Sequence, residues 1–300
     1  MNDALHDGFF NAKYSDMMRF TFMWENSGMH VTSLENFKKY VWPYWVDYYF
    51  TDPRFFVFEN KPVMTIWNLN KFEEAFGGVK GANEARKFME EDIKKYGFDG
   101  MIILFADSHS QEEATFKKMK ALGGDGGYAY HWQQDGIYAD KAMKRLENNA
   151  SFGTHVIPTA SVGFNNIGWA VGRKQMASLE EHKKQLEYIR DEYLPRFANE
   201  EKWKQQLVLI STWNEYGEGT YVMPAGVHGF GYLDNVRNVL VGEADMTPYN
   251  VKPTENQKAR LCHMYTGART TLANTDYIKD DASSQIPQKV VKELELAKWS

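Results

Sequence analysis

The chain has 300 residues, a formal net charge of −5 and a hydrophobic fraction of 43%. This hydrophobic fraction supports a sizeable core and excludes a disordered chain, while the mild acid excess argues against nucleic-acid binding. No apolar run reaches the ~18 residues of a membrane span, and the first residues contain no apolar signal core. The single cysteine, Cys262, excludes an internal disulfide and a CxxC metal site.

Apolar runs alternate with amphipathic stretches, and each pair predicts a strand followed by a helix. In chain order the predicted pairs are Met18–Trp24 with Ser33–Phe50, Val63–Trp67 with Gly81–Tyr96, Met101–Ala106 with Glu112–Leu122, Gly127–Trp132 with Asp140–Asn149, His155–Ala160 with Ser178–Phe197, and Leu207–Thr212 with Gly231–Val241. A hairpin-like arm at Phe55–Phe58 precedes the second strand. Ser33 and Ser178 are predicted N-caps, Glu181 completes a capping box with Ser178, and Gly97 is placed to end its helix.

This alternation predicts a parallel sheet covered by helices, either a doubly wound open sheet or a (β/α)₈ barrel. No GxGxxG sequence follows a strand, and polar or aromatic residues gather where the strands end, which favours the barrel. Six strands are predicted where a barrel has eight, so we expect a (β/α)₈ TIM-barrel type α/β fold that is N-terminally incomplete, with about six βα units. We expect residues 1–242 to form the barrel domain and residues 243–300 a C-terminal extension packing on it, with a late helix at Gln288–Trp299.

The segment with the clearest chemistry is Leu207–Met223, where an apolar strand runs directly into the sequence Trp-Asn-Glu-Tyr-Gly-Glu-Gly. On a continuing strand Glu215 and Glu218 would face opposite ways, but in a glycine-containing turn both can point into one cavity. Two carboxylates in a ring-walled pocket resist double ionisation, so the pKa of one rises and it can act as an acid near neutrality. Glycoside cleavage needs this division between an acid at the leaving oxygen and an assisting carboxylate. The alternative is that both are solvated loop charges or caps of the following turn.

Residues 212–220, Thr-Trp-Asn-Glu-Tyr-Gly-Glu-Gly-Thr, resemble the last-strand motif of glycoside hydrolase family 99, the endo-α-mannosidase and endo-α-mannanase barrels. They resemble even more the related family 99-like (WbsX-type) domain found in polysaccharide gene clusters. Further segments are similar to that domain in the same order: Phe22–Asn26, Asp52–Phe55 followed by Asn60–Val63, and Pro158–Trp169. The resemblance runs from about residue 5 to about residue 242, and the first two βα units of the family have no counterpart.

The resemblance implies a role for each glutamate. Glu215 would be a base on the 2-hydroxyl of the substrate, so that the sugar attacks its own anomeric carbon and passes through a 1,2-anhydro intermediate with overall retention. Glu218 would be the acid/base for the leaving group and the incoming water, and Asn214 would contact the sugar. Between the two glutamates this chain has Tyr216 and Gly217, where the family 99 enzymes typically carry Trp-His.

Other strand-end residues are candidate substrate contacts, each with a structural alternative. Trp24, with Glu25 and Asn26, is either a sugar platform with polar handles or a core tryptophan. Asp107, together with His109, either binds a substrate hydroxyl or caps the next helix. The remaining candidates suit packing or turns as well as ligand contact: Trp67, Tyr130, His131, Trp132, Asn165 and Trp213.

The sequence therefore predicts a carbohydrate-active enzyme, a retaining glycoside hydrolase (glycosidase) that cleaves a polysaccharide or glycan, with an α-mannoside-type substrate suggested by the resemblance. No metal and no cofactor are expected, because no histidine pair has ligand spacing and no P-loop or GxSxG occurs. The expected partner is an oligosaccharide or polysaccharide, without nucleic acid or a membrane segment. Two alternatives stay open: a glycosyltransferase-like protein of surface polysaccharide biosynthesis, and a non-catalytic truncated barrel that binds glycan.

Overall fold

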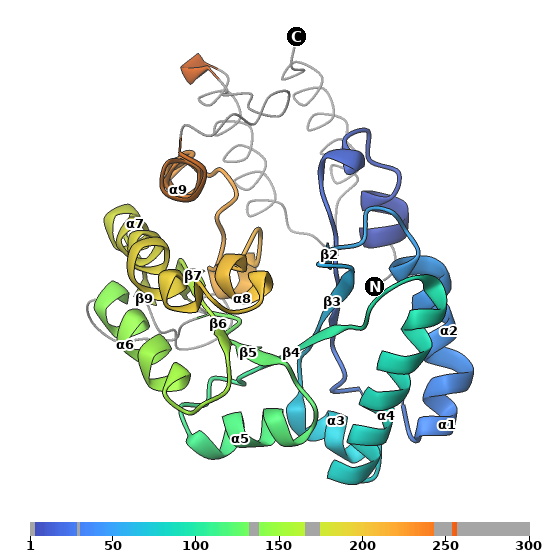
Figure 1. Cartoon of the computed structure of the whole chain (residues 1–300). Coiled ribbons are helices and arrows are strands. Elements are labelled where there is room, and N and C mark those ends of the chain that lie inside the picture. Colours follow the sequence, from blue (N-terminus) through green and yellow to red (C-terminus); the bar gives the residue numbers. More distant parts are fainter. Residues whose placement is uncertain (1–3, 29–30, 132–137, 166–174, 243–253, 257–300) are drawn as a thin grey trace, which may run out of the picture. The chain divides into compact units, whose positions relative to one another are not determined.

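A computed structural model describes residues 4–28, 31–131, 138–165, 175–242 and 254–256 (Figure 1). The chain divides into two compact units. The first unit comprises Met1–Gln133, Asp140–Thr159 and Asp191–Leu209, and the second comprises Gln134–Ala139, Ala160–Arg190 and Ile210–Ser300. The predicted C-terminal extension lies outside the described residues apart from 254–256, and so does its late helix.

The sheet of the first unit contains six strands, and five of them pair in parallel in the order in which they occur along the chain. They are β1 (Met23–Trp24), β3 (Lys61–Ile66), β4 (Ile102–Ala106), β5 (Gly126–Tyr128) and β6 (Val156–Ile157). Sequential order is that of a (β/α) barrel wall, whereas a doubly wound sheet reverses its order at a switch point. The predicted α/β class is therefore confirmed, and the strand order is of the barrel type. The sixth strand, β2 (Val57–Phe58), forms the predicted hairpin with β3.

The helices of this region follow the strands as predicted, with α5 beside β5 (Figure 1). They are α1 (Leu34–Asn36) and α2 (Trp42–Trp45), joined by π-helical turns into one stretch ending at Phe50, then α3 (Leu69–Ala75), α4 (Val79–Asp92) with a 3₁₀ turn at Ile93–Tyr96, α5 (Glu113–Ala121), α6 (Tyr138–Ala150) and α8 (Lys202–Gln206). The Ser33 hydroxyl accepts the Asn36 N–H at 3.0 Å, and Gly97 ends its helix at φ +90°. Both predicted caps are confirmed. The short helices α3 and α8 were not predicted.

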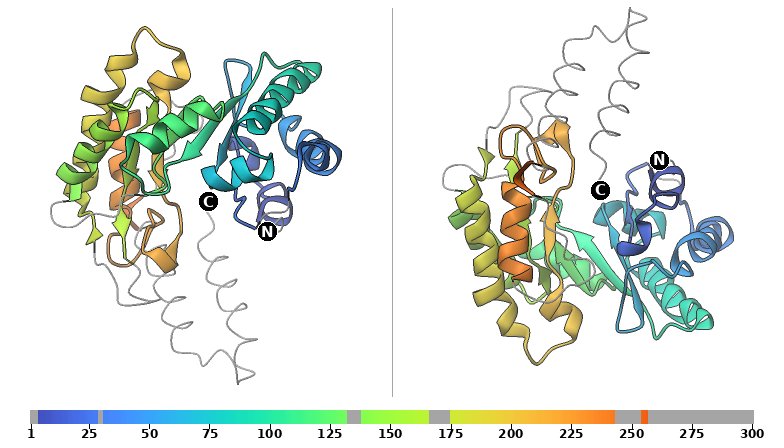
Figure 2. Two further views of the ribbon diagram at one scale, coloured as in Figure 1. Left: turned by 90° about the horizontal axis from the view of Figure 1, so that it is seen from below. Right: turned by 90° about the horizontal axis from the view of Figure 1, so that it is seen from above.

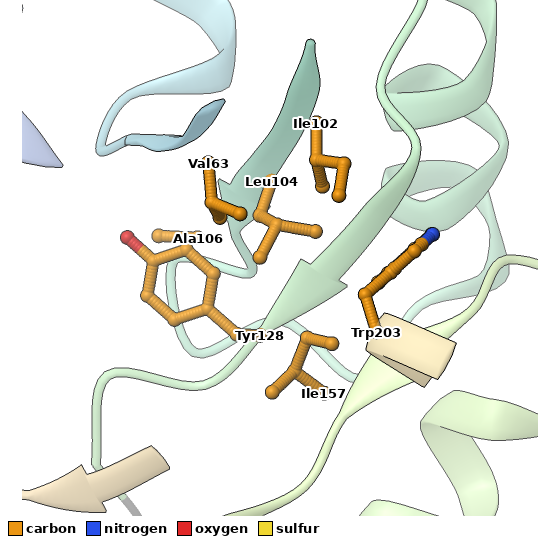
Figure 3. Packing of buried hydrophobic residues seen from close by; sticks show 7 residues of the cluster. All are labelled: Val63, Ile102, Leu104, Ala106, Tyr128, Ile157 and Trp203. Atoms are coloured by element: carbon orange, nitrogen blue, oxygen red, sulfur yellow. The ribbon is translucent and has the colours of Figure 1, made fainter. Parts of the chain in front are cut away.

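The side chains of β4 point alternately to the two faces of the sheet. Ile102, Leu104 and Ala106 belong to one buried cluster, in which they meet Val63, Tyr128, Ile157 and Trp203 (Figure 3). Phe105 points to the opposite face of the sheet, where its ring lies 5.3 Å from that of Phe72 on α3. All of β4 is buried, as its unbroken apolar run predicted. Burying one side chain such as Leu104 contributes about 1.5–3 kcal/mol, so this strand anchors the unit.

Among the described residues, two strand pairs and two helices lie wholly or largely in the second unit. β7 (Thr159–Ser161) pairs with β10 (Leu209–Ser211), and β8 (Gly163–Phe164) pairs antiparallel with β9 (Gln175–Met176). α7 (Leu179–Tyr188) continues through helical turns to Phe197, and α9 (Gly231–Val236) continues to Val241. α7 and α9 lie side by side (Figure 2). The capping box at Ser178 and Glu181 is confirmed, with mutual hydrogen bonds of 2.9 and 3.1 Å.

Four predicted strands are shorter, divided or less buried than expected. Gly127–Trp132 reduces to β5, and His155–Ala160 divides into β6 and β7 (Thr159–Ser161). Met18–Trp24 contributes only β1, because Met18 is exposed and Phe20 makes an isolated bridge to Phe55. Leu207–Thr212 reduces to β10, in which Leu209 and Ile210 are half-buried rather than buried. An apolar run indicates that its residues are buried, but it does not set the bounds of a strand, because the neighbours that cover it come from elsewhere in the chain.

Candidate functional site

Glu215 and Glu218 lie in a closed loop that follows β10 in the second unit. Glu215 and Thr220 exchange two backbone hydrogen bonds, Glu215 N to Thr220 O at 3.2 Å and Thr220 N to Glu215 O at 3.1 Å. Between them Tyr216–Glu218 form a 3₁₀ turn, which Gly219 ends at φ +66°. One short hydrogen-bonded turn therefore presents both carboxylates, where a continuing strand would have sent them to opposite faces.

Asn165, at the end of β8, packs against this loop. Its backbone N–H donates to the carbonyl oxygen of Glu218 at 2.6 Å. A Cβ placed on Gly219 would lie 2.9 Å from both the Cβ and the carbonyl oxygen of Asn165. Glycine is thus required at 219 for the left-handed φ and for the close approach. The structure brings Asn165 together with the two glutamates, as a backbone support of the loop.

The environments of the two carboxylates differ. Glu218 is half-buried, and burial raises its pKa, with a further rise from the negative charge of Glu215. Burial and the charge of Glu215 thus both favour the protonated form of Glu218. A carboxyl group that keeps its proton nearer to neutral pH is what the acid of a carboxylate pair requires.

Aromatic side chains flank the glutamates on the same loop. Trp213 is 53% exposed although it lies two residues after β10, and Asn214 is exposed as well. Tyr216 is also exposed, with its ring centroid 5.2 Å from that of Tyr221. Exposed rings next to carboxylates provide surfaces on which the C–H face of a sugar can stack. The sequence analysis predicted Trp213 and Asn214 as contacts but not Tyr221.

In the first unit Asp107 forms a buried ion pair at the carboxyl end of β4. Its side chain is only 1% exposed. One carboxylate oxygen accepts the His109 N–H at 2.9 Å, while the other lies 3.3 Å from the amide nitrogen of Asn149 and 3.7 Å from Arg145. Burial raises the pKa of Asp107 to about 6, and the positive charge of Arg145 opposes the rise without cancelling it. The helix-cap alternative is wrong, because α5 begins at Glu113 with Glu112 as its N-cap.

Two neutral histidines adjoin this pair. The rings of His109 and His131 stack at 4.7 Å between centroids. Burial lowers the pKa of both, to about 3 for His131, and Arg145 lowers it further. Ser108 and His109 both adopt left-handed backbone angles, at φ +51° and +63°, which non-glycine residues rarely do. Strain of this kind collects at functional sites, so the turn after β4 is a second candidate region.

Aromatic rings that follow β3 and β5 lie next to the histidine pair His109 and His131. Trp67 meets Tyr130 edge-on at 5.4 Å, and the ring of Tyr130 lies 5.5 Å from that of His131. Parallel strands place their carboxyl ends along one edge of a sheet, which is why residues far apart in sequence meet here. The predicted residues Trp67, Asp107, Tyr130 and His131 are therefore neighbours in space. Trp132 lies outside the described residues.

The structure places Trp24, Glu25 and Asn26 differently. The indole of Trp24 packs among core rings, with Phe37 at 6.0 Å and Trp45 at 5.1 Å. Asn26 is buried and both ends of its amide bond the backbone of Asn68, each at 2.8 Å. These contacts give Trp24 and Asn26 roles in holding β1 to β3, while Glu25 is exposed.

Comparison with known proteins identifies the family. The family described as Glycosyltransferase WbsX matches residues 20–236. The chain belongs to this family. The WbsX-type resemblance predicted from the sequence is thus confirmed, and membership supports a carbohydrate-active protein. No curated protein matches the chain.

The WbsX-family chain is also similar to solved structures of a glycoside hydrolase family 99 endo-α-mannosidase from Bacteroides thetaiotaomicron. One, in complex with bis-tris propane, shares 16% sequence identity, and another shares 17%, each with a TM-score of 0.39. Each match covers 69% of this chain, and 59% and 56% of the two solved chains respectively. The chain therefore spans less than three fifths of the length of these structures.

Arg145 and Asn149 of the WbsX-family chain contact the candidate residue Asp107, and the sequence did not single them out. Both lie on α6, on the face that also buries Ala142 and Leu146. A charged residue within the apolar stripe of an amphipathic helix signals a buried ion pair, since arginine is rarely buried unless it is paired. The sequence shows the spacing of Arg145 within this stripe, but it does not show that Asp107 is the partner of Arg145.

Within residues 4–28, 31–131, 138–165, 175–242 and 254–256, no group of three or more His, Cys, Asp or Glu side chains is arranged to hold a metal ion. Over the same part of the chain, no helix is both long and apolar enough to cross a membrane.

Proposed function

We propose that the chain is a retaining glycoside hydrolase that cleaves a polysaccharide or glycan, with Glu218 as acid/base and Glu215 as the assisting base. One observation carries the proposal: both glutamates lie on one closed loop, where burial and the charge of Glu215 raise the pKa of Glu218. A carboxyl group with a raised pKa keeps its proton nearer to neutral pH, as a general acid requires.

The proposed reaction has two steps. In the first, Glu218 protonates the glycosidic oxygen while Glu215 takes the proton of the 2-hydroxyl, whose oxygen attacks C1 as the bond to the leaving group breaks. The product is a 1,2-anhydro sugar. In the second, Glu218 takes a proton from a water molecule that attacks C1, and Glu215 returns its proton to O2. Two displacements at C1 retain the configuration.

Trp213 and Asn214 are the proposed substrate contacts beside the glutamates. An exposed indole offers a flat apolar surface to one face of a sugar ring, and an amide both donates to and accepts from hydroxyls. The family 99 resemblance of residues 212–220 favours an α-mannoside-type substrate. Within the first unit, the strand-end group of Trp67, Tyr130 and His131 is proposed as a sugar-contact surface of its own.

Glycosyl transfer is the second candidate function, and the description of the family favours it. A transferase would move a sugar from an activated donor, such as a nucleotide sugar, to an acceptor hydroxyl. The same loop carboxylates would then deprotonate the acceptor. Products distinguish the two functions, because hydrolysis creates a reducing end and transfer consumes the donor.

The test measures reducing ends released from α-mannans and other polysaccharides by the purified chain. We expect Glu218→Gln and Glu215→Gln each to lower the rate by at least about 100-fold, the usual scale of acid–base catalysis. Their melting temperatures should stay within about 2 °C of that of the unmodified chain. Glu187→Gln, which removes a surface ion pair with Lys183 on α7, is the matched control and should keep full activity.

Two outcomes would count against this assignment. If both glutamine variants keep cleaving, the carboxylate roles are wrong. If the chain consumes a nucleotide sugar and hydrolyses none of the glycans, transfer replaces hydrolysis as the function.

A further inference from the structure

A surface cavity of about 260 Å³ lies in the first unit where β6 begins. At about 30 Å³ per water molecule, the cavity has room for roughly eight water molecules. It is therefore larger than a packing defect that a single bridging water would fill. His155 lines it and directly precedes β6, so the cavity lies at the amino ends of the parallel strands. The candidate residues Asp107 and His131 follow the carboxyl ends, and none of the residues proposed for the glycosidic reaction lines this cavity.

Aromatic rings form one wall of the cavity. The ring of Phe197 meets His155 edge-on at 4.6 Å and lies 5.4 Å from the ring of Tyr193. Tyr193 is fully buried, and its hydroxyl donates to the carbonyl oxygen of Val156 at 2.9 Å. This wall is therefore held in a fixed orientation, which suits the C–H face of a small cyclic ligand.

His155 brings an unpaired polar atom to the same wall. Its Nε2 is buried and has no hydrogen-bond partner among the residues that the structure describes. Burial lowers the pKa of His155 to about 4, helped by the positive charge of Lys204, so the ring is neutral at pH 7. Leaving this nitrogen without a partner costs free energy, which a turn of the His155 ring toward a hydroxyl group in the cavity would recover.

The charges at the mouth of the cavity balance. Lys204 lies 2.8 Å from the carboxylate of Glu200 and 3.5 Å from that of Glu201, which is itself 3.4 Å from Lys61. With two cations facing two carboxylates, neither an anion nor a cation is strongly attracted. Hydroxyl groups both donate and accept, so they match a carboxylate, an ammonium group and a neutral imidazole together.

We propose that this cavity is a second carbohydrate site, which binds one neutral sugar residue such as the end or a branch of a glycan chain. The Phe197 ring, backed by the buried Tyr193 ring, faces its C–H surface, Glu200 and Lys204 bond its hydroxyls, and the His155 ring turns to bond one more. The inference rests on the proposed function for its choice of ligand. Binding itself needs no reaction at Glu215 or Glu218.

The experiment is saturation-transfer NMR on the full chain carrying Glu218→Gln, titrated with methyl pyranosides of glucose, galactose, mannose and N-acetylglucosamine. We expect saturable binding of at least one of them with a Kd of about 1–10 mM. Phe197→Leu, which removes the ring, and Lys204→Met, which keeps the apolar stem, should each weaken binding at least about fivefold. Lys202→Met, an exposed position on the same helix, is the matched control and should leave the Kd unchanged.

Three results would overturn the proposal. The first is no saturable binding of any of the pyranosides. The second is binding that Trp213→Ala abolishes while Phe197→Leu and Lys204→Met leave it intact, which would assign it to the glutamate loop. The third is binding of acetate or inorganic phosphate in place of sugars. Cleavage that survives Glu218→Gln would refute the catalytic roles alone, so the two proposals fail separately.

Discussion

Replacing Asp107 with Asn tests the buried ion pair directly. Burial raises the pKa of Asp107 from 3.8 to about 6, so between these pH values the folded chain holds a proton that the unfolded chain has lost. The stability that this carboxyl contributes is therefore full below about pH 4 and is lost as the pH rises through about 6. At about 1.36 kcal/mol per pKa unit, the loss is about 3 kcal/mol. The Asp107→Asn variant has no titrating group at this position, so its unfolding free energy should not show this loss.

The assay is urea unfolding followed by tryptophan fluorescence at pH 4, 5, 6 and 7. Between pH 4 and pH 7 the unfolding free energy of the unmodified chain should fall by about 3 kcal/mol more than that of Asp107→Asn. The reasoning is refuted if the Asp107→Asn curve runs parallel to that of the unmodified chain. A curve that falls faster would show that Arg145 lowers the pKa below its ordinary value.

Two further predictions concern the glutamate loop. Gly219→Ala should lower stability by about 1–3 kcal/mol and impair any cleavage, because the added methyl meets Asn165 at 2.9 Å and φ is left-handed. Gly153→Ala is the matched control, because Gly153 has a similar φ of +76° and an added Cβ there would meet no atom within 4 Å. Thermal unfolding of the two variants therefore separates the contact with Asn165 from the backbone strain. Equal losses of stability in the two variants would contradict the packing argument. Glu215→Gln should shift the carboxyl titration of Glu218, followed by ¹³C NMR, to lower pH, because the charge that raises its pKa is gone. An unchanged titration would mean that the two carboxylates do not interact.

The local features of this chain were predictable from its sequence. Apolar runs and helical stretches gave the order of strands and helices, because burial periodicity is a property of neighbouring residues. The Ser178–Glu181 capping box and the Gly97 helix end depend on contacts within a few residues, and both appear in the structure. The segment around Glu215 and Glu218 was also identified from its residues, since a strand followed by a glycine-containing turn is a local pattern.

The roles of buried polar groups were decided by the tertiary structure alone. From the sequence, Asp107 was either a substrate contact or, by a slight preference, a helix cap. Its ion pair depends on Arg145, which lies 38 residues further along the chain and reaches it from α6. Trp24 was interpreted as a possible sugar platform, but rings from the turn after α1, from α2 and from α3 pack around it. The physical reason is the same in both cases. Desolvation and pairing depend on which distant elements meet at a strand end, and no local pattern carries that information.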